Sequence, residues 1–523
     1  MGSGCAIVRR MRTPLFCVIT LFLLARPASA EDSVARAHVQ AALEAMGGEA
    51  RLRNLGSLRL QGVGHWNLLE QSERPTPPFL VAYEQFDEVR DLRRSRLRQR
   101  CEARGAPLPT WTPLSQVYVD GVAALERDGQ LRPAGTAQAQ DLRERLDTAP
   151  ERVLLVALDA TDLRAEPDAV MQDVPHHVVA FRQAGARVRL FLNAHTALPT
   201  AVERVEAHPE DLFWNIWGDV RTVLTFQSWS LEPGGLRYPR AWDWERNGVA
   251  YHSQTVTAVT LEAPLDEKDF ALPEAVTKGF AERASRTLEG MAPGLPGSAP
   301  IEVAPGVVQL PGRWNVALVQ QEDGIVVLEA PLTSGYSTKV LEEVARRFPG
   351  QKVKAVVSTS DAWPHIGGLR EYAARGTPVQ VLDLNRPLVE RLMKAPRLAV
   401  PDALARAPRA AKLQSLARRT ALGTGKNRME LIPVRTETGE RMLFAWLPEH
   451  HLLYTSDLVQ PAQAGGLAMP QQLSETQDVA AREKLEVGRI FGMHLGPTDW
   501  ATLAQAVEQA RAPTAPPAPP SGG

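Results

Sequence analysis

The sequence predicts two domains of different class: a mainly β domain with an antiparallel sheet, followed by a domain in which strands and helices alternate. Segments of residues 31–282 alternate apolar and polar side chains with period two, as strands with one apolar face do. In residues 301–510, short apolar runs alternate with helical apolar stripes. Residues 283–300 between them are dense in Gly and Pro and are expected to be a linker. A chain of 523 residues also exceeds what one hydrophobic core usually serves.

Residues 1–30 have the features of a secretory signal peptide. Basic residues come first, the apolar run 14–25 is too short to span a bilayer, and an A-x-A motif ends at Ala30. Cleavage between Ala30 and Glu31 is therefore expected, in preference to an uncleaved anchor. The mature protein is expected to be periplasmic or secreted, with no transmembrane helix.

Composition excludes some classes of partner and site. The formal net charge of −1 gives no electrostatic reason to bind nucleic acid. The chain has three cysteines, and the predicted signal peptide contains two of them. The remaining Cys101 can form neither an intramolecular disulfide nor a thiolate-rich metal site, and is expected to be a buried apolar residue.

The first domain is expected to open with a helix and continue as strands. An apolar stripe over 34–46 predicts the helix, and Gly47-Gly48 predicts its end. A helical insertion is expected near 138–158. Period-two alternation predicts strands that include residues 58–62, 188–192 and 256–261.

Residues 187–273 carry the pattern VRLFLNAHTALPTAVE, WGDVRTVLTFQSWSLEPGGLRYP and LDEKDFALP. This pattern resembles the curved β domains of periplasmic lipoprotein carriers of the LolA/LolB type. The resemblance implies a single curved antiparallel sheet wrapped around a helix, with an apolar concave side. It also implies a small-molecule or lipid-like ligand.

Two clusters in the first domain each allow two interpretations. Four of the arginines in 90–100 alternate from Arg94 to Arg100, which places them on one strand face. That face is either an anion-binding surface or an ordinary solvated face, and near-zero net charge favours the second. Five tryptophans fall between 214 and 244. They either line an apolar or sugar-binding face or pack in the core, and core packing is favoured.

The second domain is expected to contain a buried strand over 324–329, followed by a helical stripe over 340–348. Strand 353–357 then leads into a loop and a helix that ends at Gly376. The later predicted strands are 378–382, 429–433, 442–447 and 451–455. The Pro-rich segment 511–523 has nothing to bury and is expected to be disordered.

The loop after strand 353–357 reads Thr359-Ser360-Asp361-Ala362-Trp363-Pro364-His365-Ile366-Gly367-Gly368. It resembles the metal-binding loop of the metallo-β-lactamase superfamily, T-H-x-H-x-D-H-x-G-G, with most ligands replaced. The resemblance covers essentially all of 301–510, including the LPEHHLLYTSDL segment. It implies an αββα sandwich and a hydrolase-like function.

Family members hold two zinc ions with five histidines and two aspartates. Carried onto this chain, the resemblance keeps three of these ligands, His365, Asp457 and His494. The replaced positions are Ser360, Ala362, Pro364 and either Thr436 or Thr438. The three histidines of the first zinc site are lost, so the resemblance implies at most one Zn²⁺, held by two histidines and one carboxylate. Asp361 and Glu437 are the two candidate replacements for the lost loop aspartate.

Two functions follow from this reduced ligand set. In the first, His365, Asp457 and His494 hold one Zn²⁺, and a metal-bound hydroxide attacks an ester-type substrate. In the second, the protein is a non-catalytic binding or scaffold protein that holds an apolar ligand or a partner. The sequence names no catalytic residue beyond these ligands, and fold alone does not decide between the two.

Overall fold

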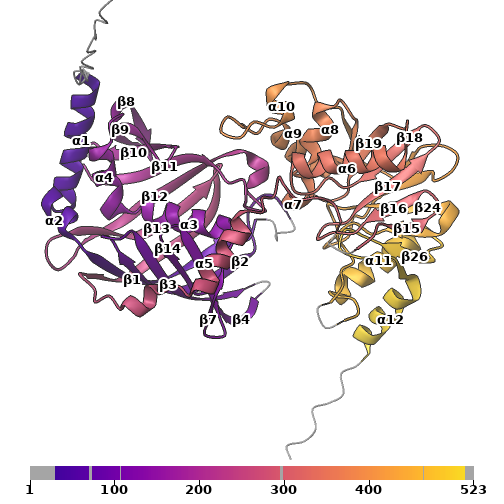
Figure 1. Cartoon of the computed structure of the whole chain (residues 1–523), viewed down its shortest axis with the longest axis horizontal. Coiled ribbons are helices and arrows are strands. Elements are labelled where there is room, and N and C mark those ends of the chain that lie inside the picture. The colour runs from indigo at the N-terminus through magenta and orange to yellow at the C-terminus, as the bar shows by residue number, and fades with distance from the viewer. Residues whose placement is uncertain (1–29, 70–73, 106–107, 295–297, 463–464, 513–523) are drawn as a thin grey trace, which may run out of the picture.

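The computed structural model describes residues 30–69, 74–105, 108–294, 298–462 and 465–512. They form an N-terminal part and a C-terminal part, joined through α5 (Glu274–Ala284) and an irregular stretch (Figure 1). The predicted signal peptide, apart from Ala30, and the predicted tail from residue 513 onwards lie outside the described residues. No helix in the described ranges is long and apolar enough to cross a membrane.

The described residues of the N-terminal part form one 14-stranded sheet in the order β7-β6-β5-β3-β2-β1-β14-β13-β12-β11-β10-β9-β8, with β4 paired to β3. Neighbouring strands are antiparallel throughout, as predicted. The strands are β1 (Ser57–Asn67), β2 (Val81–Asp91), β3 (Arg96–Gly105), β4 (Leu108–Pro113), β5 (Gln116–Val119), β6 (Val122–Arg127), β7 (Gln130–Pro133), β8 (Arg164–Met171), β9 (Val174–Gln183), β10 (Ala186–Asn193), β11 (Pro199–Ala207), β12 (Asp219–Leu231), β13 (Arg237–Arg246) and β14 (Val249–Leu261). The helices are α1 (Ala30–Met46), α2 (Glu49–Asn54), α3 (Thr136–Asp147), α4 (Pro150–Asp159), η1 (Asn215–Trp217) and η2 (Glu267–Phe270).

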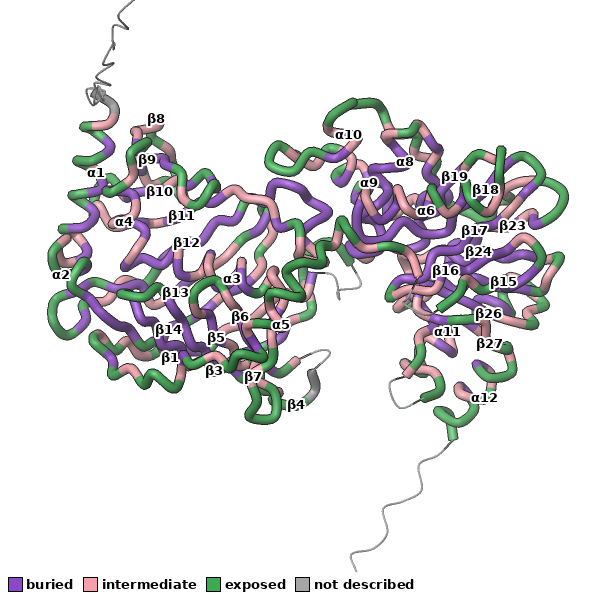
Figure 2. Tube along the Cα trace, in the orientation of Figure 1, coloured by how far each residue is buried: buried purple, intermediate pink, exposed green. Residues whose placement is uncertain are grey.

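One face of this sheet packs against α1, α2 and α4. Leu43 and Leu154 of the helices share a buried core with apolar side chains of β1, β2 and β9 to β14 (Figure 2). The predicted end of α1 is confirmed, because Gly47 has a φ of 126°. A side chain there would also place its Cβ 2.6 Å from the Gly235 carbonyl oxygen. Glycine therefore lets the chain turn tightly from α1 into α2.

The prediction that the four alternating arginines form a solvated face is wrong for two of them. Arg96 and Arg98 are buried, with 6% and 7% of their surface exposed. The arginines pair with carboxylates from η2 and β6: Arg94 and Arg96 with Glu267, Arg98 with Glu126, and Arg100 with Asp269. The face is covered by the chain itself, which alternation within one strand does not reveal.

The described residues of the C-terminal part form a seven-stranded sheet, β15 to β21 in order, and a six-stranded sheet, β22 to β27 in order. The first contains β15 (Ile301–Ala304), β16 (Val307–Leu310), β17 (Val316–Gln321), β18 (Gly324–Leu328), β19 (Val353–Ser358), β20 (Val379–Leu382) and β21 (Leu413–Leu416). The second contains β22 (Thr420–Leu422), β23 (Met429–Pro433), β24 (Leu443–Leu447), β25 (Leu452–Tyr454), β26 (Arg489–Phe491) and β27 (Thr498–Asp499). The helices are α6 (Ser334–Arg347), α7 (Trp363–Ile366), α8 (Leu369–Ala374), η3 (Asp383–Asn385), α9 (Arg386–Met393), α10 (Ala403–Arg406), η4 (Pro448–His450), α11 (Pro470–Arg482) and α12 (Trp500–Arg511).

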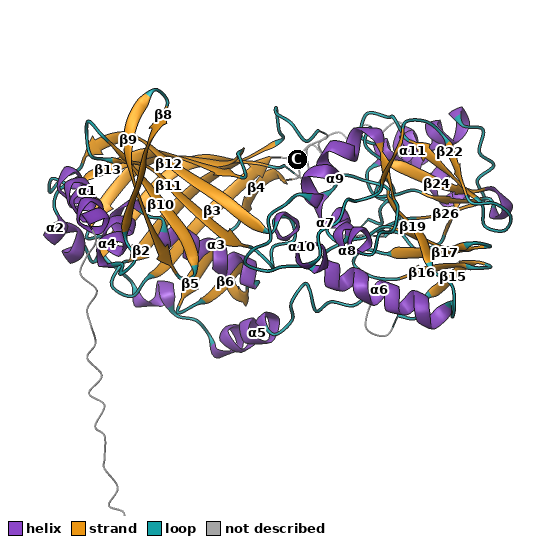
Figure 3. Cartoon of the chain, turned by 90° about the horizontal axis from the view of Figure 1, so that it is seen from above, coloured by secondary structure: helices purple, strands orange, loops and turns teal. Residues whose placement is uncertain are grey.

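The two sheets stack between outer helices, giving four layers (Figure 3). In β18, Ile325 and Val327 pack with α6, α8 and α9, while Val326 and Leu328 pack with the second sheet. The far face of the second sheet packs with α11 and α12. Strands buried on both faces explain why β18 is apolar throughout rather than alternating. The layers therefore run helix, sheet, sheet, helix.

Tryptophans join the two parts. Trp214 and Trp217 of the N-terminal part each lie edge-to-face with Trp363, at ring-centroid distances of 5.0 and 5.1 Å. All three are at most 7% exposed. Trp242, by contrast, lies in the core beneath α1 and α4, where core packing of the tryptophans was predicted. The aromatic cluster buries the start of α7 against the N-terminal part.

Hydrogen bonds cross the same contact in both directions. The Asp219 carboxylate accepts the backbone N–H groups of Leu398 and Ala399, at 2.6 and 3.1 Å. In return, the Arg397 guanidinium donates to the carbonyl oxygens of Asn215 and Ile216, at 3.1 and 2.7 Å. Charged groups on both sides thus satisfy backbone groups of the opposite part, which defines one relative orientation of the two.

Candidate metal centre

The candidate site begins where β19 ends. After Ser358 the chain turns into α7, and Pro364 stands at the second position of this helix, where its missing N–H costs nothing. Gly367 and Gly368 follow because the chain passes too close to the start of α6 for side chains. A Cβ at Gly367 would lie 2.0 Å from the carbonyl oxygen of Leu332. This close approach presents His365 on the inner side of the loop.

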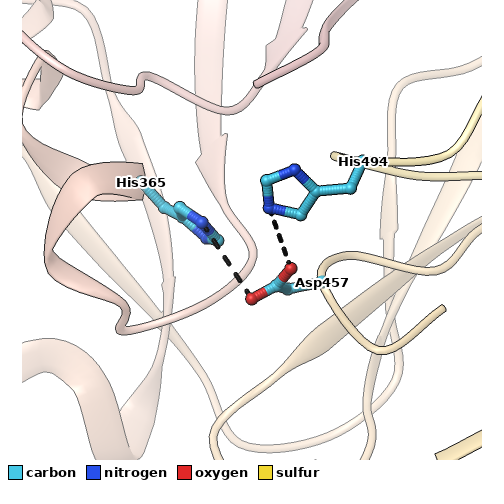
Figure 4. Close-up of side chains that lie close together, drawn as sticks. All are labelled: His365, Asp457 and His494. Carbon is cyan, nitrogen blue, oxygen red and sulfur yellow. Dashed lines mark ion pairs between the residues drawn. The ribbon is translucent and has the colours of Figure 1, made fainter. Parts of the chain in front are cut away.

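The structure brings His365, Asp457 and His494 together from three separate segments (Figure 4). His365 comes from α7, Asp457 follows β25 and His494 follows β26. The Nε2 atom of His494 lies 3.2 Å from one carboxylate oxygen of Asp457, and that of His365 lies 4.0 Å from the other. One carboxylate thus stands between two imidazoles, and each of its oxygens faces one ring.

The second ring nitrogen of each histidine, Nδ1, also has a hydrogen-bond partner. Nδ1 of His365 is 2.8 Å from the Ser360 hydroxyl, and Nδ1 of His494 is 3.0 Å from the carbonyl oxygen of Arg313. The side-chain amide of Gln460 donates to Asp457 at 2.8 Å. Ligating histidines in metalloproteins are oriented in this way, with the outer nitrogen bonded and the inner nitrogen free to coordinate.

Burial and the carboxylate of Asp457 determine the protonation states of the two histidines. Burial lowers the pKa of His365 to about 4, despite the nearby Asp457, so this ring is neutral at pH 7. Burial also pulls down the pKa of His494, but the hydrogen bond to Asp457, the charge of Asp457 and the bond to the Arg313 carbonyl oxygen together outweigh burial, and the net pKa is raised. The pKa of Asp457 is lowered, because the two imidazoles and Gln460 overcome its desolvation. The charged carboxylate and the neutral His365 ring suit a cation, which would have to displace the proton that the raised pKa favours on His494.

The donor set fits one ion. Nitrogen and oxygen ligands lie about 2.0–2.2 Å from Zn²⁺, so two ligands of one ion are at most roughly 4.4 Å apart. The ligand atoms of the three residues all lie within 4.8 Å of one another. Small side-chain rotations would bring them into this range. Two histidines and one carboxylate leave positions open for water or substrate.

The replaced positions have acquired other contacts. Ser360, where the resemblance would place a histidine, contacts His365. The Thr438 hydroxyl donates to Glu475 of α11 at 2.8 Å. Of the two stand-ins considered from the sequence, Glu437 is exposed. Asp361 lies 3.8 Å from Arg441, and burial raises its pKa to about 6. The structure therefore assembles the three retained ligands and neither stand-in.

Sequence reasoning missed one acidic group at this site, Glu329. It follows β18, is 1% exposed and has a φ of 78°. The hydroxyl of Thr359 donates to its carboxyl group, and the Tyr454 hydroxyl lies 3.5 Å away. Burial, with Asp457 adding to it, raises the pKa of Glu329 well above its usual range. An acidic residue directly after an apolar strand was the available signal, because buried charges are rare without a role.

A second group of potential ligands, Asp141, Glu144 and His208, lies in the N-terminal part. The guanidinium of Arg246 donates to Asp141 at 2.8 Å and to Glu144 at 3.4 Å. This side chain already supplies the positive charge that a metal ion would bring. The group is therefore a structural ion-pair cluster.

The same cluster predicts an acid-sensitive stability. Burial lowers the pKa of His208 to about 4 from a model-compound value of 6.5, so the unfolded state binds its proton first as pH falls. We expect protonation of this histidine in the unfolded state to lower the free energy of unfolding by about 2 kcal/mol between pH 7 and pH 5. Urea unfolding at both pH values should show a correspondingly smaller loss in His208→Gln. An equal loss in the variant and the wild type would contradict this assignment.

Comparison with known proteins gives structural similarity over part of the chain. No family model and no curated protein matches it. The stereoselective inverting sec-alkylsulfatase Pisa1 from Pseudomonas sp. is 15% identical, with a TM-score of 0.31, over 40% of this chain and 41% of that chain. The metallo-beta-lactamase from Pontibacter korlensis is 16% identical, with a TM-score of 0.31, over 40% of this chain and 97% of that chain. DIM-1 metallo-beta-lactamase is 15% identical, with a TM-score of 0.31, over 40% and 96%.

The chain thus spans about two fifths of the alkylsulfatase and nearly all of each β-lactamase. At this identity and TM-score, the similarity carries no information about activity. What it supports is that about two fifths of this chain is structurally similar to metallo-β-lactamase-fold hydrolases.

Proposed function

We propose that residues 301–510 are a metallo-β-lactamase-fold domain that holds one metal ion at His365, Asp457 and His494 and acts as a hydrolase. We further propose that residues 31–282 are a LolA/LolB-like domain, and that the protein is exported after cleavage between Ala30 and Glu31. Zn²⁺ is the proposed ion, because two imidazoles and one carboxylate suit it.

The convergence of the two Nε2 atoms on Asp457 carries this proposal. Side chains that merely persisted from a lost site would have no reason to keep both outer nitrogens bonded and both inner nitrogens facing one carboxylate. Here the Ser360 hydroxyl and the Arg313 carbonyl oxygen hold the rings in that orientation. When bound, a single Zn²⁺ with open positions lowers the pKa of its water to about 7, which suits hydrolysis of an ester-type substrate.

Metal content tests the proposal. Protein purified without chelator should contain about one equivalent of zinc, measured by plasma mass spectrometry, because three donors converge on one position. His494→Ala should lose most of it. His195→Ala is the matched control, since His195 is an exposed histidine of the N-terminal part and should leave the content unchanged.

Two results would refute the proposal. The first is metal-free wild-type protein that stays free of zinc after incubation with the ion and is folded by circular dichroism. The second is equal zinc content in the wild type and His494→Ala, which would place the ion elsewhere.

One observation favours the alternative, a non-catalytic binding or scaffold protein. In the metallo-β-lactamase family this loop carries metal ligands. In this chain the loop carries Trp363, and the Trp363 side chain packs against the N-terminal part. A loop used for assembly needs no metal. Correctly folded, metal-free protein would therefore support the alternative, in which the N-terminal part holds an apolar ligand or a partner.

A further inference from the structure

The loop that joins β16 to β17 is fastened to the segment that carries His494. The backbone N–H of Asn315 donates to the carbonyl oxygen of Met493 at 2.7 Å. The side-chain amide of Asn315 donates to the carbonyl oxygen of Gly492 at 3.1 Å. In the same loop, the carbonyl oxygen of Arg313 lies 3.0 Å from Nδ1 of His494. These contacts hold Arg313 directly beside one of the three proposed metal ligands.

Exposure shows from which side the metal centre is open. The side chains of His494 and Asp457 are 24% and 18% exposed, whereas that of His365 is 5% exposed. Solvent and substrate therefore reach the centre from the side of His494. The β16–β17 loop lies on this side, and Arg313 is an exposed residue of the loop. The Arg313 side chain is thus available to a molecule that enters the site.

The positive charge of Arg313 is not compensated by an ion pair among the described residues. Its guanidinium lies 5.1 Å from the centre of the Trp314 ring. An aromatic ring attracts a cation but brings no negative charge, and it leaves the N–H donors in the guanidinium plane free. The charge of Arg313 acts on the metal centre, because it opposes the rise in the pKa of His494. Arg313 is therefore a cation at the entrance with free donors.

The nearby acidic groups do not cancel this charge. Asp361 faces Arg441 at 3.8 Å. Burial raises the pKa of Glu329 well above its usual range, so this group is uncharged at pH 7. The remaining carboxylate, Asp457, is the proposed ligand, and with Zn²⁺ bound to it and two neutral imidazoles the centre has a net charge of about +1. Arg313 adds a second positive charge, so the entrance attracts anions.

We propose that Arg313 determines the substrate class of the proposed hydrolase, an ester whose acyl group ends in a carboxylate. This inference rests on the proposed function, because the ester carbonyl is assigned to the metal centre and the carboxylate to Arg313. The planar N–H donors of a guanidinium match a carboxylate. Hydrolysis of such an ester breaks the bond between the carbonyl carbon and the ester oxygen, adds one water across it, and yields a dicarboxylate and an alcohol.

Isothermal titration of the zinc-loaded full chain with glutarate and with pentanoate tests this proposal. The two ligands have the same carbon chain and differ by one carboxylate, so the ratio of their affinities measures what that carboxylate contributes. We expect glutarate to bind about fivefold tighter than pentanoate, or more. Arg313→Gln should abolish this difference, and Arg313→Lys, which keeps the charge, should retain part of it. Arg418→Gln, which replaces an exposed arginine between β21 and β22, should leave the ratio unchanged.

Equal affinity for the two ligands in the wild type, or no glutarate binding, would overturn the proposal. The same ratio in the wild type and Arg313→Gln would overturn it as well. The variant keeps the backbone carbonyl oxygen that contacts His494, and both ligands are measured on one protein, so a partial loss of zinc lowers both affinities and leaves the ratio. Zinc content is measured separately. Protein that binds no zinc refutes the metal centre, whereas zinc-loaded protein with an unchanged ratio refutes only the role of Arg313.

Discussion

Replacing Trp363 with alanine should weaken zinc binding about tenfold to a hundredfold, although Trp363 is not a ligand. Its side chain is 7% exposed and stands two residues before His365. Its ring packs edge-to-face on Trp214 and Trp217, so truncation leaves a large void between the two parts. Such truncations cost about 3–5 kcal/mol where the surroundings cannot collapse. The freed loop would then hold His365 less firmly against Asp457.

Competition between the protein and a chromophoric zinc chelator measures this affinity. Trp363→Phe should recover most of it, because a smaller ring still fills much of the void. Trp500→Ala is the control, since Trp500 lies on α12, away from the loop. Cobalt substitution adds a spectroscopic readout, because a displaced His365 would change the visible absorption of bound Co²⁺. Wild-type affinity and spectrum in Trp363→Ala would show that the N-terminal part does not support the site.

Several elements of the C-terminal part could be predicted from the sequence because each has a recognisable local pattern. The apolar run of β18 and the helical stripe of α6 both lie where periodicity places them. Gly376, with a φ of 74°, follows α8 as expected. Local patterns carry this information because periodicity and glycine conformations act over a few residues.

The candidate site could be named only by resemblance. His365 and His494 are 129 positions apart, and no local pattern connects them. The structure places both beside Asp457. The contacts that orient the rings were not predictable, since one is a backbone carbonyl oxygen, that of Arg313, to which every residue type is equivalent.

Contacts between segments that are distant in the sequence account for the remaining differences between the predictions and the structure. The sequence favoured core packing for Trp214 and Trp217 over an exposed apolar face, but it did not identify their partner, Trp363. Arg96 is buried by contacts that include Glu267 and Phe270, more than 170 positions later in the sequence. Pairing of this kind depends on tertiary structure, which the period of a single strand does not encode.

Replacing Arg90 with methionine should destabilise the N-terminal part by about 3–5 kcal/mol. Arg90, Glu88 and Glu151 are all fully buried, with side chains 0% exposed. The guanidinium donates to Glu88 at 2.6 Å and to Glu151 at 2.8 Å. Methionine fills similar space but leaves both carboxylates without this partner. Glu88 retains a second cation, Arg145, at 2.6 Å, whereas Glu151 retains a neutral partner, the hydroxyl of Tyr238.

This difference between the two carboxylates predicts the order of a variant series. Arg90→Met combined with Glu151→Met should be more stable than Arg90→Met alone, because the second change removes the carboxylate that has lost its cation. Arg94→Met should cost less than about 1 kcal/mol, since Arg94 is 63% exposed and pairs with an exposed Glu267. Urea unfolding followed by circular dichroism gives each free energy of unfolding. If the double variant is less stable than Arg90→Met, the cost comes from lost packing around the pair, and the unpaired charge of Glu151 is not its cause.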